Sequence, residues 1–207
     1  MGHMRNLENA LRKSALPPGD AGADAAAGRF IARADDAGLL EVAYASIDSP
    51  LGELLAAATP RGLLRLSYDP RRNDDVLAKI AERVSPRVLE APAKLDDVRR
   101  QLDEYFVGER RRFDLKLDWS LTRGFFQRIL RETAKLDYGQ LATYKQMAEA
   151  AGSPRAVRAA GNALGSNPIP IVVPCHRIVR SDHSLGGYTG GIAIKERLLA
   201  LEGVRLS

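Results

Sequence analysis

The hydrophobic pattern of this 207-residue chain changes from strands to helices along its length. Runs of strand-forming residues separated by Pro- and Gly-containing turns occupy 40–47, 53–58 and 63–68 and predict an antiparallel meander. Apolar residues at helical spacing follow in 73–84 and 95–105, and helical patterns then dominate the second half. We therefore expect an α+β chain in which a small sheet-and-helix domain precedes a helical domain.

The predicted domain boundaries follow from changes in composition. Residues 1–37 include a run rich in Ala, Gly and Asp with few large apolar side chains, so we expect a flexible leader, of which residues 1–4 are a tag remnant. The N-terminal α/β domain is expected over 38–119, closed by a further strand at 113–119. The C-terminal domain is expected over 120–207.

Positive charge is concentrated in the second half of the chain. The net charge is +5, and residues 119–207 hold 12 Lys and Arg against 6 Asp and Glu. A basic segment of this kind favours an anionic partner, most often nucleic acid, although a basic surface also serves solubility alone. No apolar run approaches the roughly 20 residues needed to cross a bilayer, and no secretory signal is evident, so we expect no membrane association and a cytoplasmic location.

A helix-turn-helix is predicted near residue 150. Thr143 and Gln146 form a capping-box pattern at the start of one short helix. After the turn at Gly152, Ser153 and Pro154 are expected to open a second helix that carries Arg155 and Arg158 and ends near residue 164. Helix pairs around a Gly turn also occur in proteins that never bind DNA.

The second helix of this pair is rich in small residues, among them Ala159 and Gly161. Its backbone is therefore able to approach a narrow groove closely, which favours contact with DNA shape over reading of base edges. Packing of the small residues against a neighbouring helix explains the same pattern, and the sequence leaves both alternatives open.

Cys175 is the only cysteine, and it lies between Pro174 and the pair His176-Arg177. A lone cysteine forms no internal disulfide; it is either an inert core thiol or a thiol kept for chemistry, and the adjacent histidine favours the second. One cysteine with His176 and His183 is too few for a four-ligand zinc site, and no phosphate loop or dinucleotide fingerprint is present. We therefore expect no metal and no cofactor.

Residues 125–203 resemble the O6-alkylguanine-DNA alkyltransferases, also called methylated-DNA–protein-cysteine methyltransferases. The 38–119 segment resembles them only in its element order, which implies a ribonuclease H-like fold. The positions that carry the resemblance, in the family's order and spacing, are Tyr144, Arg158, Asn167, Pro174, Cys175, His176, Arg177, Gly186, Gly187, Tyr188, Thr189, Gly190, Gly191, Lys195 and Glu196.

The resemblance implies direct repair of duplex DNA that contains O6-alkylguanine. The alkyl group would move to Cys175 in a single turnover, after the damaged nucleotide rotates out of the stack. By resemblance, His176 acts as the base through a water molecule, Glu196 orients its imidazole, Asn167 braces the turn that holds the cysteine, and Tyr144 donates a hydrogen bond to the leaving guanine.

The resemblance also assigns substrate and DNA contacts. Pro170 and Tyr188 would line the base pocket, while main-chain groups at Cys175, Ile178 and Thr189 would contact the polar edge of the base. Arg158 would fill the gap left by the flipped nucleotide, with further DNA contacts from Arg155, Thr143 and Ala159. No obligate protein partner is expected, and clustering of molecules along DNA is left open.

Two other functions are compatible with parts of this pattern. A non-catalytic sensor of alkyl lesions resembles the same family but lacks the reactive cysteine, so Cys175 disfavours it. A cysteine hydrolase built on Cys175, His176 and Glu196 is disfavoured because such enzymes usually bring the histidine from a distant part of the chain.

Overall fold

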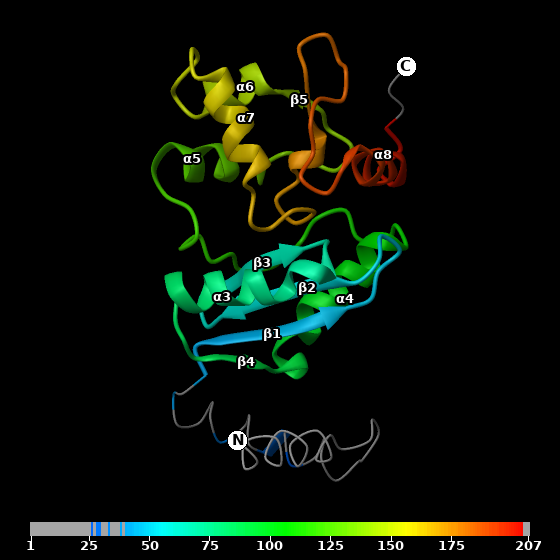
Figure 1. Ribbon diagram of the computed structural model, residues 1–207. Helices are drawn as coiled ribbons and strands as arrows, with labels where there is room; N and C mark the ends of the chain where they lie inside the picture. The colour runs from blue at the N-terminus through cyan, green and yellow to red at the C-terminus, as the bar shows by residue number, and fades with distance from the viewer. Residues whose placement is uncertain (1–25, 27, 30–32, 34–37, 39, 205–207) are drawn as a thin grey trace, which may run out of the picture. The chain divides into compact units, whose positions relative to one another are not determined.

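The computed structural model describes residues 40–204 together with residues 26, 28, 29, 33 and 38 (Figure 1). The chain divides into two compact units, Met1–Leu40 and Glu41–Ser207. Most of the predicted leader and the whole tag remnant lie outside the described residues. The second unit contains both predicted domains, whose boundary at 119 stays a prediction. No helix in the described part of the chain has the length and apolar character of a membrane span.

A four-stranded sheet forms the first half of the second unit. Its strands are β1 (Val42–Ile47), β2 (Leu54–Thr59), β3 (Gly62–Ser67) and β4 (Val88–Glu90), in the order β3-β2-β1-β4. The first three pair antiparallel, which confirms the predicted meander. β4 was not predicted; it is three residues long and pairs in parallel with β1.

Two helices cover the sheet on opposite faces. Helix α3 (Asn73–Arg83) packs Val76 and Ile80 on one face, and α4 (Asp96–Phe106) packs Val98 and Leu102 on the other. A short 3-10 turn precedes each helix, at Pro70–Arg72 (η1) and Pro92–Leu95 (η2). Arg72 occupies the N-cap position of α3, and Asn73 is its first helical residue.

The segment 113–119 is not a strand. Leu117 forms only an isolated bridge with Leu63. Lys116 lies so close to Gly62 that a Cβ on Gly62 would collide with the Lys116 carbonyl oxygen. Gly62 has a φ of 133°, a backbone conformation that residues other than glycine rarely adopt. The segment crosses the end of β3 and continues into the helical half.

The second half is built from helices and short irregular segments. They are α5 (Gly124–Thr133), β5 (Ala142–Thr143), α6 (Tyr144–Ala150), α7 (Val157–Gly165), η3 (Cys175–Arg177), β6 (Ile178–Val179) and α8 (Ile192–Leu201). Figure 1 shows this half next to the β3 edge of the sheet. The Leu66 amide of β3 donates a hydrogen bond of 2.8 Å to the Pro168 carbonyl. The core on the α4 face of the sheet is continuous with the core of the helical half.

The helix-turn-helix forms as predicted at its first helix and starts later than predicted at its second. Thr143 caps α6, and both hydrogen bonds of the capping box with Gln146 are present. Ser153, Pro154 and Arg155 lie in the turn, and α7 begins only at Val157. The Ala156 amide bonds to the Ser153 carbonyl, which closes the turn before the helix starts.

Candidate active site

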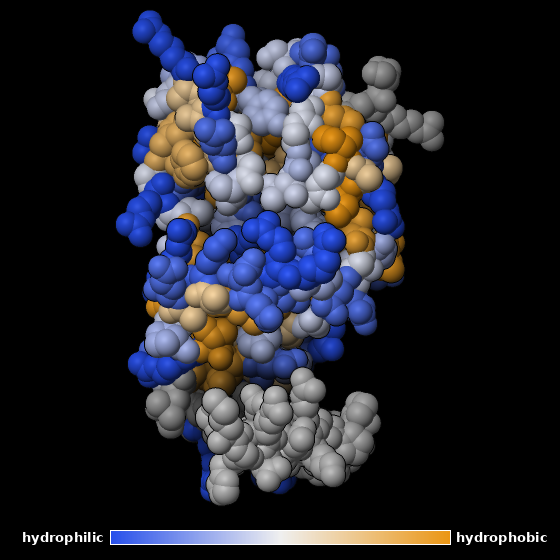
Figure 2. All heavy atoms as spheres, viewed as in Figure 1, coloured by the Kyte–Doolittle hydropathy of each residue, from blue (hydrophilic) through white to orange (hydrophobic). Residues whose placement is uncertain are grey.

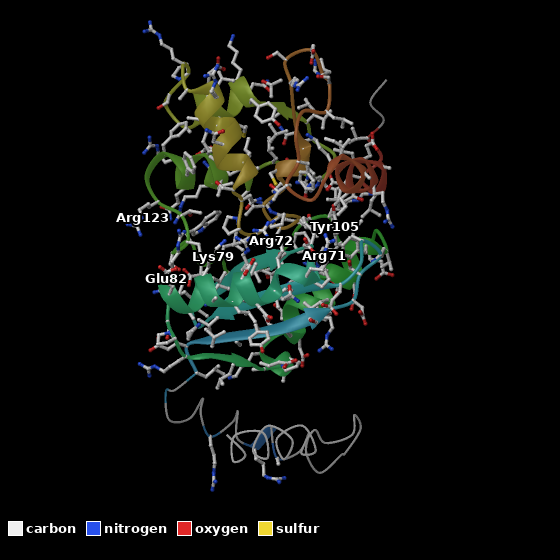
Figure 3. The ribbon with its side chains drawn as sticks, in the orientation of Figure 1. Arg71, Arg72, Lys79, Glu82, Tyr105 and Arg123 are labelled. Carbon is white, nitrogen blue, oxygen red and sulfur yellow. The ribbon has the colours of Figure 1, made fainter. Side chains whose placement is uncertain are left out.

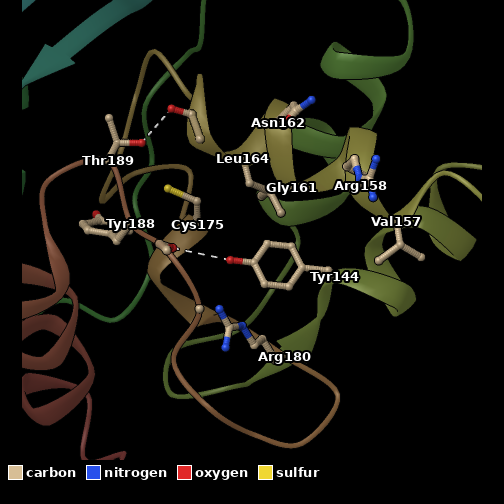
Figure 4. A pocket seen from close by; sticks show the side chains of 13 residues that line it. Tyr144, Val157, Arg158, Gly161, Asn162, Leu164, Cys175, Arg180, Tyr188 and Thr189 are labelled. Atoms are coloured by element: carbon tan, nitrogen blue, oxygen red, sulfur yellow. Dashed lines mark hydrogen bonds between the residues drawn. The ribbon is translucent and has the colours of Figure 1, made fainter.

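A pocket of about 560 Å³ opens between α7, the start of η3 and the loop before α8 (Figure 4). Figure 4 shows Tyr144, Cys175 and Tyr188 reaching it from three different elements. Among the described residues that line it, two are cationic and none is acidic. The lining residues are Tyr144, Val157, Arg158, Gly161, Asn162, Leu164, Gly165, Cys175, Arg180, Gly186, Gly187, Tyr188 and Thr189.

Asn167 holds the turn that carries the cysteine. Its Nδ2 donates to the Val173 carbonyl at 2.8 Å and lies 3.1 Å from the sulfur of Cys175, while its Oδ1 accepts from the Ile169 amide at 3.0 Å. Ile171, within this turn, has a φ of 72°, which is rare for a β-branched residue. Asn167 therefore bonds to both sides of the turn and places a donor next to the sulfur.

The cysteine segment is joined to the helix-turn-helix by a short parallel ladder. β5 pairs with β6 in the register Ala142 to Ile178 and Thr143 to Val179. Thr143 is also the N-cap of α6, and β6 follows directly after η3. The start of the helix-turn-helix and the Cys175 turn therefore share one hydrogen-bonded unit.

The Cys175 thiol is buried, with 5% of the residue exposed at the pocket. Burial raises its pKa to about 11, although the Asn167 hydrogen bond, the Lys195 charge and the Tyr188 hydroxyl all act to lower it. Only a thiolate is strongly nucleophilic, so chemistry at this sulfur requires a group that takes its proton.

His176 is fully buried behind the cysteine, and Glu202 orients its ring. The His176 Nε2 lies 2.9 Å from a carboxylate oxygen of Glu202. Burial lowers the pKa of His176, so the ring is neutral near pH 7, with Nε2 donating to the carboxylate. The Nδ1 atom is buried and has no hydrogen-bond partner in the described part of the chain. This neutral nitrogen is available as a proton acceptor.

The prediction that Glu196 orients His176 is wrong. Glu196 is exposed on the outer face of α8, whereas Glu202 follows Lys195, Leu198 and Leu199 on the inner face of the helix. Residues three or four apart share a face of a helix, so spacing from the buried residues of α8 would have indicated Glu202.

Glu202 is the centre of a buried network that reaches several elements. It accepts hydrogen bonds from Arg177, from the Gly139 amide and from Tyr105 of α4, in addition to its contact with His176. Burial alone would raise the pKa of Glu202, but the bonds from His176 and Arg177 outweigh it and hold that pKa well below its usual range. Figure 3 shows Tyr105 where α4 approaches the helical half.

Tyr144 stands at the pocket wall as predicted. Its hydroxyl lies 3.4 Å from the Gly187 carbonyl, and burial and the neighbouring Cys175 raise its pKa. The phenol therefore keeps its proton and remains a donor. Gly186 makes this position possible, because a Cβ there would lie 2.7 Å from the Tyr144 hydroxyl oxygen.

Two of the predicted substrate-contacting residues lie in the pocket lining, and their contact with a base stays a prediction. Tyr188 and Thr189 line the pocket, and Thr189 donates a hydrogen bond to the Gly165 carbonyl at 2.8 Å. Pro170 is buried away from the lining, so the prediction that it lines the pocket is wrong. Ile178 is also buried; its amide bonds to Cys175 and its carbonyl accepts from Lys195 at 2.5 Å, so a contact with a base stays a prediction.

The predicted DNA-contacting residues all belong to the helix-turn-helix. Arg158 is exposed and lines the pocket, and Arg155 is exposed in the turn before α7. Thr143 caps α6, and Ala159 is partly buried on α7. The DNA contacts of these four residues stay a prediction.

Two basic residues near the sulfur had no predicted role. Arg180 is exposed and lines the pocket, and Figure 4 shows it beside Tyr144. Lys195 is fully buried and donates to the Ile178 and Leu185 carbonyls. Burial lowers the pKa of Lys195 to about 8, against the raising effect of Cys175. Local sequence gives no signal for Arg180, because its position depends on how the loop before α8 folds back.

Among the described residues, no three His, Cys, Asp or Glu side chains are grouped so as to hold an ion. Figure 2 shows that hydrophilic side chains cover most of the molecular face shown there.

Two family models match the chain and divide it between them. Residues 42–119 match the ribonuclease-like domain of 6-O-methylguanine DNA methyltransferase, and residues 124–204 match the DNA-binding domain of the same protein.

Known proteins resemble about half of the chain. A methylated-DNA–protein-cysteine methyltransferase of Methanosarcina barkeri is 47% identical over 103 residues, which cover 50% of this chain and 65% of that protein. The human protein of the same name is 46% identical over 87 residues, covering 42% of this chain and 41% of the human one. The first three curated relatives are matched over only 61% to 65% of their length.

Solved structures match over more of the chain. The O6-methylguanine methyltransferase of Mycobacterium tuberculosis is 36% identical, with a TM-score of 0.68, over 80% of this chain and 95% of that one. A structure of the M. tuberculosis protein in complex with DNA has a TM-score of 0.66, at 36% identity over 77% of this chain and 92% of that one.

The fold and the site define a mixed α+β protein with a buried, histidine-backed thiol beside a helix-turn-helix, which confirms the predicted fold class. The chain belongs to the family of O6-methylguanine DNA methyltransferases, also named methylated-DNA–protein-cysteine methyltransferases.

Proposed function

We propose that this protein repairs alkylated duplex DNA by moving the alkyl group from O6 of guanine to Cys175, once per molecule. The observation that carries this proposal is the sole cysteine of the chain, seated in the pocket beside a neutral histidine that Glu202 orients. The family assignment supports the same reaction. A thioether on Cys175 is not cleaved by water, so each molecule would react a single time.

The chemistry balances with the residues present. The sulfur of Cys175 forms a bond to the alkyl carbon as the carbon–O6 bond breaks. The thiol proton passes through a water molecule to Nδ1 of His176, whose imidazolium is stabilised by Glu202. Tyr144 donates a hydrogen bond to the departing guanine and neutralises its developing charge. The guanine anion then takes a proton at N1 from water, and His176 returns its proton to water. The products are unmodified guanine and S-alkylcysteine.

The substrate must enter the pocket as a flipped nucleotide. The alkyl carbon is hidden inside a duplex, and Cys175 is exposed only at the pocket. Extrusion of a base costs about a few kcal/mol of lost stacking. Arg158 supports this step by its position, because it is exposed on α7 at the rim of the same pocket.

The helix-turn-helix supports contact with the DNA backbone and minor groove. The α7 face that includes Ala159 and Gly161 has few long side chains, and a bare helix approaches a narrow groove closely. Arg155, Arg158 and Arg180 supply positive charge for phosphates near the pocket. We also propose that the partner is duplex DNA containing O6-alkylguanine and that the protein acts in the cytoplasm.

Mass spectrometry of the reacted protein tests the function. After incubation with duplex DNA containing O6-methylguanine, the peptide with Cys175 should gain one methylene, in a yield limited by protein. Cys175→Ser should bind the same duplex and leave the lesion intact. Repeated turnover of lesion, or repair by the serine variant, would contradict the proposal, as would hydrolysis of ester substrates at Cys175.

Arg158→Ala tests the flipping role separately from the chemistry. Its single-turnover rate on duplex lesion should fall by about tenfold or more, because the extruded state loses its stacking substitute. The rate with free O6-benzylguanine should change little, since no base needs to leave a stack. Equal losses on both substrates would remove Arg158 from the flipping step.

A further inference from the structure

A pair of tyrosines links the sheet to the active-site pocket. Tyr68 directly follows β3, and Tyr188 lies in the pocket wall before α8. Their hydroxyl oxygens are 2.6 Å apart, and their ring centroids are 6.1 Å apart with a tilt of 55°. Tyr68 has no further hydrogen-bond partner for its hydroxyl in the described part of the chain. Among the described residues, the Tyr68 hydroxyl therefore bonds to Tyr188 alone.

The two rings are fixed by the loop that follows Tyr188. A Cβ on Gly190 would lie 2.9 Å from Cδ2 of Tyr68 and 3.2 Å from Cε1 of Tyr188. Contacts below 3.0 Å force neighbouring atoms to move, so the loop lies directly on both rings. The position of Tyr188 therefore depends on the ring of Tyr68.

Tyr188 also lies close to the cysteine. Tyr188 and Cys175 line the same pocket, where Figure 4 shows them beside each other, and the Tyr188 hydroxyl opposes the rise in the Cys175 pKa caused by burial. Burial raises the pKa of both tyrosines, so each phenol keeps its proton. The pair therefore holds two hydroxyl hydrogens, of which the hydrogen bond between the two oxygens uses one.

We propose that Tyr68 is a positioning residue that acts through Tyr188 on the thiolate of Cys175. When the sulfur becomes charged, Tyr68 donates to the oxygen of Tyr188, and Tyr188 directs its own hydrogen to the sulfur. A hydrogen bond to the charged form favours that form, and successive hydrogen bonds strengthen each other. This inference rests on the proposed role of Cys175 as the nucleophile.

The hydrogen-bond relay from Tyr68 through Tyr188 to Cys175 is tested by titrating the thiol in Tyr68→Phe. Because the chain has a single cysteine, the pH dependence of its alkylation by iodoacetamide reports the Cys175 thiolate alone. The midpoint should rise by about half a pH unit, and the single-turnover transfer rate near pH 7 should fall about threefold. Tyr44→Phe, on β1 away from the pocket, is the matched control and should leave both values unchanged.

A double-mutant comparison separates the relay from general loosening of the fold. Tyr68→Phe should have no further effect on the midpoint once Tyr188→Phe is present, because its only route to the sulfur is gone. Gly190→Ala keeps both hydroxyls but displaces the Tyr68 ring, and it should raise the midpoint as Tyr68→Phe does. If the Tyr68→Phe protein does not fold, Gly190→Ala serves as the test variant in its place.

Three results would overturn the relay. They are an unmoved midpoint in folded Tyr68→Phe, an equal shift with and without Tyr188, and an unmoved midpoint in Gly190→Ala. The iodoacetamide titration contains no DNA. A failure of the proposed repair function would therefore appear only in the transfer assay and not in this one.

Discussion

The buried carboxylate of Glu202 contacts three side chains that support the active site. It neutralises Arg177, orients His176 and accepts the hydroxyl of Tyr105, a residue from the other half of the fold. Arg177 also donates to the Leu136 carbonyl. With Arg177 balancing its charge, Glu202 does not require a protonated histidine, which leaves His176 neutral and able to accept a proton.

Glu202→Gln should impair both chemistry and stability. The amide cannot balance the charge of Arg177, and loss of one partner of a buried ion pair costs about 3 to 5 kcal/mol. We expect a fall of that order in the free energy of unfolding measured with urea, and a single-turnover rate lowered by about 100-fold or more in the folded fraction. The matched variant is Glu196→Gln, on the exposed face of the same helix, which should behave as wild type. If the two variants exchanged these phenotypes, Glu202 would not be the residue that orients His176.

Local sequence predicted the residues next to the cysteine better than those brought there by folding. Cys175 and His176 are adjacent in the chain, and the roles of Asn167 and Tyr144 were implied by the resemblance to the family. Glu202 was missed because Glu196 lies on α8 and Glu202 is its C-cap, and only the spacing from the buried residues of α8 distinguishes the two glutamates.

At the scale of elements, the loop before α8 shapes the pocket. Residues 186, 187, 190 and 191 are glycines, and two of them lie against aromatic rings. Gly186 has a φ of 65° and faces the hydroxyl of Tyr144. The loop therefore holds its position because side chains are absent at the points where it crosses these rings.

Gly186→Ala should displace Tyr144 and slow transfer strongly. The added methyl would lie 2.7 Å from the hydroxyl oxygen, and a φ of 65° costs alanine about 1 kcal/mol or more. We expect a single-turnover rate at least about tenfold lower. Gly187→Ala adds the same methyl where no atom lies within 4 Å, so its loss should be smaller. A rate for Gly186→Ala equal to or above that of Gly187→Ala would contradict this account.

The elements that the sequence predicted well have long, regular hydrophobic patterns. The meander, α4 and the capped start of α6 were all predicted close to their observed positions. β4 was missed because three residues are too short to establish a period. The segment 113–119 alternates like a strand, but its contact with Gly62 leaves room for only one bridge. The late start of α7 reflects a turn closed by Ser153, which hydrophobic periodicity does not show.

At the scale of the whole molecule, acid should weaken the fold in two steps. Burial holds the pKa of His176 below its usual 6.5, so the unfolded chain binds that proton first as the pH falls. The contribution of His176 to the free energy of unfolding is complete above pH 6.5 and is lost as the pH falls below that value. Glu202 has a pKa held below 4.5, so its contribution is complete above that value and is lost at lower pH.

Urea unfolding across pH measures both steps. Between pH 6.5 and 5.5, the free energy of unfolding should fall with a slope of at most about 1.4 kcal/mol per pH unit for His176. His176→Gln should flatten this interval, whatever its effect on total stability, and keep the fall below pH 4.5. An unchanged slope between pH 6.5 and 5.5 in the variant would contradict the assignment of this interval to His176.

The order of strands and helices was sufficient to predict the fold class, because each pattern commits a segment to one kind of element. The way the sheet half contacts the helical half was not predictable from sequence patterns. Tyr68 and Tyr105 both lie in apolar contexts that read as ordinary core. Their hydroxyls meet Tyr188 and Glu202, more than ninety residues away along the chain.

The bonds from Tyr105 to Glu202 and from Tyr68 to Tyr188 have a practical consequence. A backbone cut near residue 121 would leave the downstream fragment with all of its reacting groups but without two of the hydroxyls that support them. If the proposed function holds, such a fragment should take up the methyl group of O6-methylguanine slowly, and addition of the upstream fragment should restore the rate of transfer. The two pieces would then serve as a split tag that reports when proteins fused to them come together.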